Sequence, residues 1–421
     1  MRQIENTDWQ KTFFLVWIGQ AFSILGSELV QFSLVWYLTR ETGSAAVLAF
    51  ASFVALIPRV VLNPIAGALV DRWNRQHVMI FADAGVALVT MLMAFLFWLG
   101  EVSLWQIYAI LFLRALGGGF HWPAMQASTS LMVPKQHLSR ISGLNQTLRG
   151  ALGVTTPVFA ALLIESIPLF GILSIDVITA IIAISPLLFV VIPQPVSNNS
   201  TGISPVKLFD DVRAGLKYMF KWKGLLYLAL SATVLNFLLS PGYTFTPLLV
   251  RDHFGKGAID LSFLESAFSG GMIIGGVVLS AWGGFKRNIY TTLAGILGLA
   301  VGTGLVAASQ ADQFNMAVTG MALAGFMQPI ANGPIFAIIQ SKVDPEIQGR
   351  IFTLLESMVS AMMPISMIIA APIAEWIGVR GWLVFGSIGC LVIGVSGFFI
   401  PALTNIENHE PLREEFAPAI E

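Results

Sequence analysis

Three charged residues, Glu28, Arg59 and Arg114, stand far from the ends of long apolar segments of the sequence. A charge inside a bilayer is costly, and it commonly marks an ion or substrate pathway. A carboxylate in such a place can bind a proton in apolar surroundings and release it beside an arginine. We therefore predict that Glu28 carries protons and that Arg59 or Arg114 competes with the proton for it. The alternative is a permanent ion pair that only fixes packing.

Arg59 permits a second interpretation, because it follows Pro58 in the middle of its apolar segment. A fixed guanidinium in that position can bind an anionic group of a substrate. The cargo would then carry a carboxylate or a phosphate. Structural pairing with Glu28 competes with this role.

Further polar and aromatic side chains within the apolar segments are candidates for a substrate cavity. Amides in lipid need hydrogen-bond partners, so they favour positions that face a cavity. The predicted cavity residues are Gln20, Gln31, Asn63, Trp122, Gln126, Asn236, Phe326, Gln328, Asn332 and Glu356.

Asp83 and Asp176 lie nearer to the ends of their segments, where water can reach them. At these positions, gating or helix-end roles compete with proton coupling.

The composition predicts the elements that must position these residues. Of the 421 residues, 56% are hydrophobic and only 11% are charged, whereas a soluble domain has roughly 25% charged residues. Backbone groups in lipid are satisfied within helices, and each span needs ~20 residues. We predict an all-α membrane protein with twelve transmembrane helices in two six-helix bundles. The predicted spans are 12–38, 46–69, 77–99, 104–131, 140–165, 169–192, 225–250, 260–282, 288–308, 312–340, 350–375 and 380–402.

Basic residues between the predicted spans fall mostly on one side, which places both termini in the cytoplasm. The predicted parts are an N-terminal bundle over 1–192, a cytoplasmic linker over 193–224, a C-terminal bundle over 225–403 and a cytoplasmic tail over 404–421. Within the linker, Leu208, Val212, Leu216 and either Met219 or Phe220 have helical spacing. This pattern predicts an amphipathic helix on the inner membrane surface, with a solvated linker helix as the alternative.

The two halves of the sequence repeat each other. The string Gly119-Phe-His-Trp-Pro123 has a counterpart in Gly325-Phe-Met-Gln-Pro329, and Arg140-Ile141 recurs as Arg350-Ile351. A weaker copy of the segment from Gly67 to Arg75 stands between Gly276 and Arg287, with Ser280 in place of Asp71. Three matches in the same order predict a six-helix unit used twice, as parallel repeats.

The joint between the second and third predicted spans has the pattern Gly67-x-x-x-Asp71-Arg72-x-x-Arg75. It resembles the signature loop of the major facilitator superfamily, and Arg114-Ala-Leu-Gly-Gly118 is similar to the helix-four arginine motif of that family. Further strings resemble the bacterial macrolide-efflux branch, whose members export drugs. They are Trp17-x-Gly19-Gln20-Ala21, Phe120-His121-x-Pro123-Ala124 and Ile175-Asp176-Val177.

The resemblance implies the family's fold and a place in the inner membrane of a bacterium. It also implies an inner gate in which Asp71 acts as a latch against the eleventh span, which begins near Gly349-Arg350. The predicted gate residues are Gly67, Asp71, Arg72, Arg75 and Arg350. This sequence has Asn74 where the motif usually has glycine, and we expect Asn74 to adopt the left-handed conformation that asparagine tolerates. Gln76 replaces the second base.

We predict an exporter of amphipathic, macrolide-like drugs that exchanges them for protons by alternating access, and so contributes to antibiotic resistance. An exporter or flippase of an anionic siderophore or lysolipid is the alternative, and a non-transporting receptor is a further one. No metal-binding or phosphate-cradling motif is present, so we expect no enzyme, metal or cofactor. The expected partners are a small substrate, protons and membrane lipid, with no nucleic acid, and the expected state is a monomer.

Overall fold

The computed structural model describes residues 8–100, 102–134, 137–192, 216–343 and 345–408. Several side chains inside helices are outside the described part. They include the side chains of five residues that the sequence analysis assigned to proton coupling, the substrate cavity or the inner gate. The predictions for Arg59, Asn63, Asp71, Arg72 and Arg350, for Gly67, and for the linker up to residue 215 therefore fall outside the described part.

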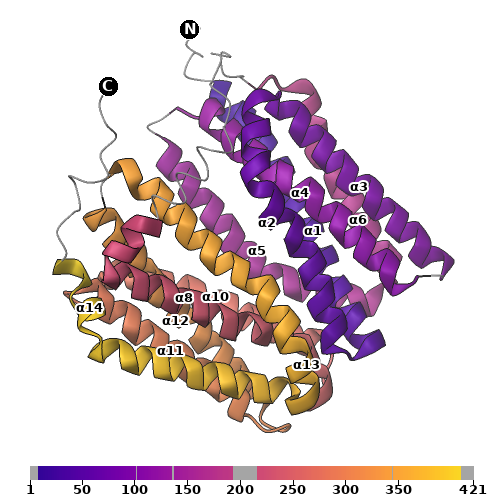
Figure 1. The fold of residues 1–421 in the computed structure, drawn as a ribbon. Coiled ribbons are helices and arrows are strands. Elements are labelled where there is room, and N and C mark those ends of the chain that lie inside the picture. The colour runs from indigo at the N-terminus through magenta and orange to yellow at the C-terminus, as the bar shows by residue number, and fades with distance from the viewer. Residues whose placement is uncertain (1–7, 101, 135–136, 193–215, 344, 409–421) are drawn as a thin grey trace. The chain divides into compact units, whose positions relative to one another are not determined.

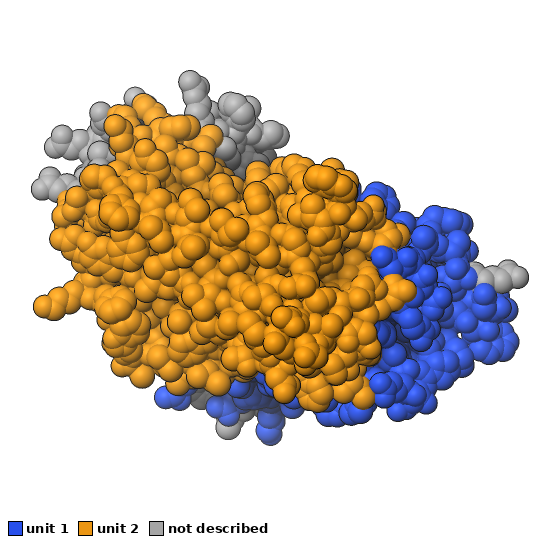
Figure 2. All heavy atoms as spheres, turned by 90° about the horizontal axis from the view of Figure 1, so that it is seen from below, with its two compact units in different colours: residues 1–43, 50–200 blue, residues 44–49, 201–421 orange. Residues whose placement is uncertain are grey.

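The described chain is helical and divides into two compact units, residues 1–43 with 50–200 and residues 44–49 with 201–421 (Figure 2). Most of the helices of the first unit are long (Figure 1). They are α1 (Asp8–Thr42), α2 (Ala45–Arg72), α3 (Arg75–Leu99), α4 (Leu104–Met132), α5 (Leu138–Ser166) and α6 (Leu169–Phe189). The beginning of α2, residues 45–49, is grouped with the second unit. Those of the second unit are α8 (Lys223–Thr244), α9 (Thr246–Leu248), η2 (Leu249–His253), α10 (Ala258–Trp282), α11 (Asn288–Ala308), α12 (Phe314–Lys342), α13 (Pro345–Phe399), α14 (Pro401–Thr404) and η3 (Ile406–Asn408).

Nine helices among the described residues are long and apolar enough to cross a membrane. The all-α membrane fold is confirmed, but the count of twelve is not. One of the nine stretches, Ile351–Phe399, contains a break at Gly378, whose φ of 78° is left-handed. This break falls between the predicted spans 350–375 and 380–402, because glycine can adopt a conformation that ends a right-handed helix.

Each unit is built around helices packed face to face. In the first unit α1 packs on α5 and α6, while α3 packs on α4 and α6. In the second unit α12 packs on α10 and α11, while α13 packs on α8 and α11. The apolar core of each unit lies between these packed helices. Their packing determines which side chains of each helix meet inside the unit.

The end of the predicted linker helix is described and belongs to the second unit. Residues 216–221 are helical, and Tyr218 and Met219 are buried in the same apolar core as Trp222, whereas Phe220 is exposed. Of the two residues that continued the apolar pattern, Met219 is therefore the buried one. This stretch packs on protein rather than standing alone.

Candidate functional site

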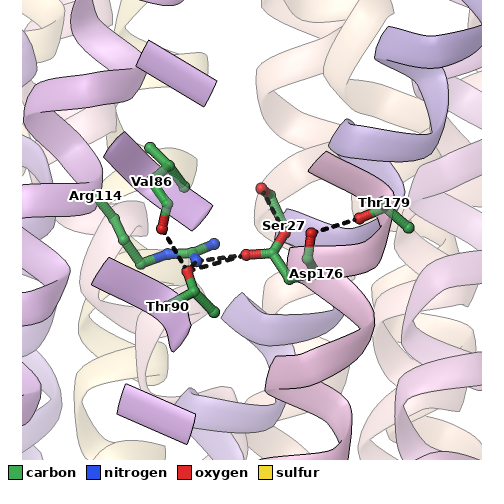
Figure 3. A network of polar contacts seen from close by, with 6 residues as sticks. All are labelled: Ser27, Val86, Thr90, Arg114, Asp176 and Thr179. Carbon is green, nitrogen blue, oxygen red and sulfur yellow. Dashed lines mark hydrogen bonds and ion pairs between the residues drawn. The ribbon is translucent and has the colours of Figure 1, made fainter. Parts of the chain in front are cut away.

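An ion pair between Arg114 and Asp176 joins α4 to α6 inside the first unit. Arg114 Nη1 lies 2.6 Å from Asp176 Oδ2 (Figure 3). Asp176 is 2% exposed and the Arg114 side chain 11%. A buried carboxylate needs such a cation, because neither charge is hydrated.

Hydroxyl groups from two other helices complete this cluster. Thr90 on α3 donates to Asp176 Oδ2 at 3.1 Å and also accepts a hydrogen bond from Arg114 Nη1. Ser27 on α1 donates to Asp176 Oδ1 at 3.1 Å. Beside it, Gly26 leaves room for the carboxylate, since a Cβ there would lie 3.0 Å from Asp176 Oδ1. We call Ser27, Thr90, Arg114 and Asp176 the Arg114 layer (Figure 3).

A second polar cluster lies on the same helices. Gln20 on α1 donates to Asp83 Oδ2 on α3 at 3.0 Å, and His121 Nε2 on α4 lies 3.3 Å from Asp83 Oδ1. Gln20 is 2% exposed and Asp83 7%. We call these three residues the Asp83 layer.

The two layers have a common spacing. Gln20 and Ser27 on α1, Asp83 and Thr90 on α3, and Arg114 and His121 on α4 are each separated by seven residues. Seven residues make two helical turns, so each pair lies on one face of its helix and about 10 Å apart. Three helices of the first unit therefore meet through polar groups at two levels.

The predicted proton-coupling residues are not brought together in the described part. Arg114 is held by Asp176, so the structure does not support it as the competitor for Glu28. Asp176 was expected to be hydrated near a helix end, and this was wrong because it faces α3 and α4 rather than water. Glu28 is exposed on α1, and the side chain of Arg59 lies outside the described part.

The predicted cavity residues divide by exposure. Gln20 departs from the prediction, because its amide nitrogen donates to Asp83 and its side chain is buried inside the unit. Asn236 accepts a hydrogen bond from Ser240 on the same helix, with its Oδ1 2.7 Å from Ser240 Oγ. Asn236, Phe326 and Gln328 are half-buried, and the exposed members are Gln31, Trp122, Gln126, Asn332 and Glu356.

The joint between α2 and α3 differs from the expectation in its backbone. Asn74 has a φ of −66° and is extended, and its Oδ1 accepts a hydrogen bond from His77 N at 3.2 Å as the N-cap of α3. Gln76 donates to the Leu187 and Val190 carbonyls and accepts from Ile192 N. Its amide thereby satisfies backbone groups at the end of α6. Arg75 is 8% exposed.

Sequence reasoning missed Arg149 on α5. Its guanidinium carbon lies 4.0 Å from the centre of the Trp122 ring on α4. Arg149 is exposed and stands well inside the predicted span 140–165. The depth criterion that selected Glu28 would have found it.

Comparisons with known proteins agree with this architecture. The model of the Major Facilitator Superfamily matches residues 16–366. Macrolide efflux protein A of Streptococcus pyogenes is 32% identical over 389 residues, which are 92% of this chain and 95% of that protein. Multidrug efflux pump Tap of Mycobacterium bovis is 21% identical over 407 residues, 94% of each chain.

Solved transporters share the fold. The nucleoside transporter NupG superposes with a TM-score of 0.71 at 13% identity, covering 91% of this chain and 98% of that one. A bacterial homologue of the iron transporter ferroportin has a TM-score of 0.68 at 14% identity and covers 95% and 99%. Fold and relatives are those of multi-pass membrane transporters.

Proposed function

Because the chain belongs to the Major Facilitator Superfamily, we propose that it is a secondary exporter that moves amphipathic, macrolide-like compounds out of a bacterial cell in exchange for protons. It works in the inner membrane by alternating access, with both termini in the cytoplasm. The relatives with the highest identity named above carry efflux in their names, which supports the direction and the cargo.

The observation that carries proton exchange is the concentration of ionisable groups inside the first unit. The Arg114 and Asp83 layers are about 10 Å apart along α3 and α4, and each holds a carboxylate beside a basic side chain. Charges are retained inside membrane helices mainly where protons, ions or substrates move.

Glu28 is the proton carrier in this proposal. It follows Ser27, which bonds Asp176, but its own side chain is exposed. An exposed carboxylate can exchange protons with water, whereas Asp176 is enclosed by α1, α3 and α4 and serves as the fixed partner of Arg114. The competing cation for Glu28 is then Arg59.

The joint around Gly67 and Asp71 acts as the inner gate. Support comes from its neighbours, since Asn74 caps α3 and Gln76 ties the start of α3 to the end of α6. The start of α3, which follows the gate loop, is thus held to the end of α6 within the first unit, and this suits a loop that changes its contacts.

The test is uptake into inverted membrane vesicles with an imposed proton gradient, using erythromycin as the macrolide. Wild type should accumulate the drug, and Glu28→Gln should abolish gradient-driven accumulation. The same variant should retain drug counterflow, in which labelled drug exchanges for unlabelled drug without a gradient, because binding and alternating access do not need the proton.

Glu41→Gln is the matched control, since Glu41 lies on the same helix but is exposed at its end beside Arg40. It should transport like wild type. Gradient-driven accumulation in Glu28→Gln at the wild-type rate would remove Glu28 from the coupling step. Absence of any gradient-driven uptake by wild type would contradict proton-coupled drug export.

A further inference from the structure

The α4 and α5 helices of the first unit each present a row of exposed polar side chains. The spacing along each helix is three or four residues, which puts the members of each row on one face. The rows consist of Trp122, Gln126 and Ser130 on α4, and of Ser142, Gln146 and Arg149 on α5. Contact between Arg149 and Trp122 shows that the two rows lie beside each other at that level.

Such a surface does not suit contact with lipid tails. Arg149 is about 16 Å from the first residue of α5 and about 25 Å from the last, at ~1.5 Å per residue, so it lies too deep to reach the headgroups. By contrast, the exposed side chains of α3 include Phe81, Leu88, Leu92 and Phe95. The polar rows are therefore suited to an aqueous path, because a charge and amides facing hydrocarbon would be destabilising.

The position of the Arg149 guanidinium leaves its hydrogen-bonding capacity available. Its carbon lies over the indole of Trp122, which is itself 43% exposed. A guanidinium stacked on a ring keeps its N–H groups in its own plane, where they match a carboxylate or phosphate in a fork. Among the described residues, no carboxylate forms an ion pair with Arg149.

We propose that Arg149 and Trp122 form a binding subsite for the anionic group, a carboxylate or phosphate, of an amphipathic cargo. The guanidinium binds the anion, the indole edge contacts the adjoining apolar part, and Gln126 and Gln146 hydrogen-bond the polar substituents. This inference rests on the proposed function, because it adds anionic amphiphiles to the compounds that the same exporter carries.

The experiment compares cholate, an amphipathic carboxylate, with its neutral methyl ester. Binding of each is measured by calorimetry on the purified full chain in detergent, and gradient-driven uptake of each is measured in inverted vesicles. Wild type should bind cholate at least tenfold more tightly than the ester. Arg149→Gln should remove this preference while leaving ester binding unchanged, and Arg149→Lys should retain part of it, because lysine keeps the charge but not the planar fork.

Arg140→Gln is the matched control, because Arg140 is exposed on the same helix near its beginning. It should bind both compounds like wild type. Equal affinity of wild type for cholate and ester, or an equal loss of both in Arg149→Gln, would overturn the subsite. Calorimetry does not depend on the proton gradient. Cholate binding by a wild type that shows no gradient-driven uptake of erythromycin would therefore refute the proposed function and leave the subsite standing.

A lipid headgroup is the other source of the same anionic chemistry. The second arm measures cholate binding in nanodiscs of phosphatidylcholine and of phosphatidylglycerol. Similar affinities in both would assign the subsite to cargo. Loss of cholate binding in phosphatidylglycerol, restored in phosphatidylcholine, would show that the site holds a lipid phosphate and would overturn its assignment to cargo.

Discussion

The sequence predicts that the two units are repeats of one another, yet they fill their interiors differently. Among the described residues, the buried polar side chains of the second unit are serines and threonines, apart from the aromatic residues Tyr218, Trp222 and Trp382, whereas the first unit buries Gln20, Arg75, Asp83 and Asp176. The second unit instead brings helix backbones together at glycines. A Cβ on Gly302 of α11 would lie 2.6 Å from Ala324 N of α12.

Equivalent positions of the repeat make the contrast specific. His121 of the first unit contacts Asp83 across the boundary between α4 and α3. Its counterpart Met327 packs across the boundary between α12 and α11, where a Cβ on Gly298 would lie 2.5 Å from Met327 Sδ. The first unit thus has a pair of ionisable side chains at this helix boundary, whereas the second unit has an apolar contact there. The difference fits our proposal that proton exchange takes place in the first unit.

The largest effect is expected where a buried charge loses its partner. Asp176→Asn should lower the free energy of unfolding by ~3–5 kcal/mol, because it leaves the Arg114 guanidinium buried and uncompensated. Thermal unfolding of the purified wild type and variant in the same detergent measures this loss of stability. In the second unit Asp260→Asn removes a more exposed pair with Lys256, 3.0 Å apart, and should cost no more than ~1 kcal/mol.

The double variant Arg114→Met with Asp176→Leu tests the cause. It removes both charges, so its stability should return close to that of wild type. Stability that stays as low as in Asp176→Asn would mean that the shape of the site, rather than the uncompensated charge, sets the loss. Equal costs for Asp176→Asn and Asp260→Asn would break the contrast between the units.

A second comparison uses the matching glycines of the repeat, Gly119 and Gly325. A Cβ on Gly325 would overlap the Phe268 carbonyl and lie 2.7 Å from its carbon, whereas a Cβ on Gly119 would lie 3.8 Å from Leu62 Cδ1. Gly325→Ala should therefore destabilise by ~1–3 kcal/mol by forcing α10 from α12. Gly119→Ala should be neutral or stabilising by up to ~1 kcal/mol through helix propensity. The melting temperatures of the two variants test this prediction. A similar loss of stability in both would show that close backbone packing is not a feature of the second unit alone.

The third comparison replaces a residue of one unit by its counterpart in the other. His121→Met leaves Asp83 with Gln20 but without the imidazole, and should cost ~1–3 kcal/mol for the poorly compensated carboxylate. Adding Asp83→Asn should recover part of that loss, because it removes the charge. Met327→Leu keeps volume and should cost less than ~1.5 kcal/mol. An unchanged melting temperature in His121→Met would show that the imidazole contributes nothing to the Asp83 layer.

The all-α membrane fold could be predicted from the sequence because the length and apolar composition of its segments report directly on membrane-spanning helices. The partners of the charged side chains could not be predicted, because they depend on how each helix is rotated about its own axis. Asp176 looked like a helix-end residue by position, yet it faces Arg114 from α6. The seven-residue spacing of Gln20 with Ser27, and of Asp83 with Thr90, was present in the sequence, but nothing there distinguished the inward face from the outward one.

The smallest expected effect concerns the two joints that the repeat places at Asn74 and Gly283, 209 residues apart. Gly283 has a φ of 76°, in the left-handed region, whereas Asn74 is an extended N-cap. Gly283→Ala should cost ~1–2 kcal/mol, because a Cβ disfavours that backbone. Asn74→Ala should cost ~1 kcal/mol through the lost cap, and Asn74→Gly only a few tenths. If Asn74→Gly stabilised the protein as measured by melting temperature, a left-handed backbone at residue 74 would be indicated, and the two joints would be alike after all.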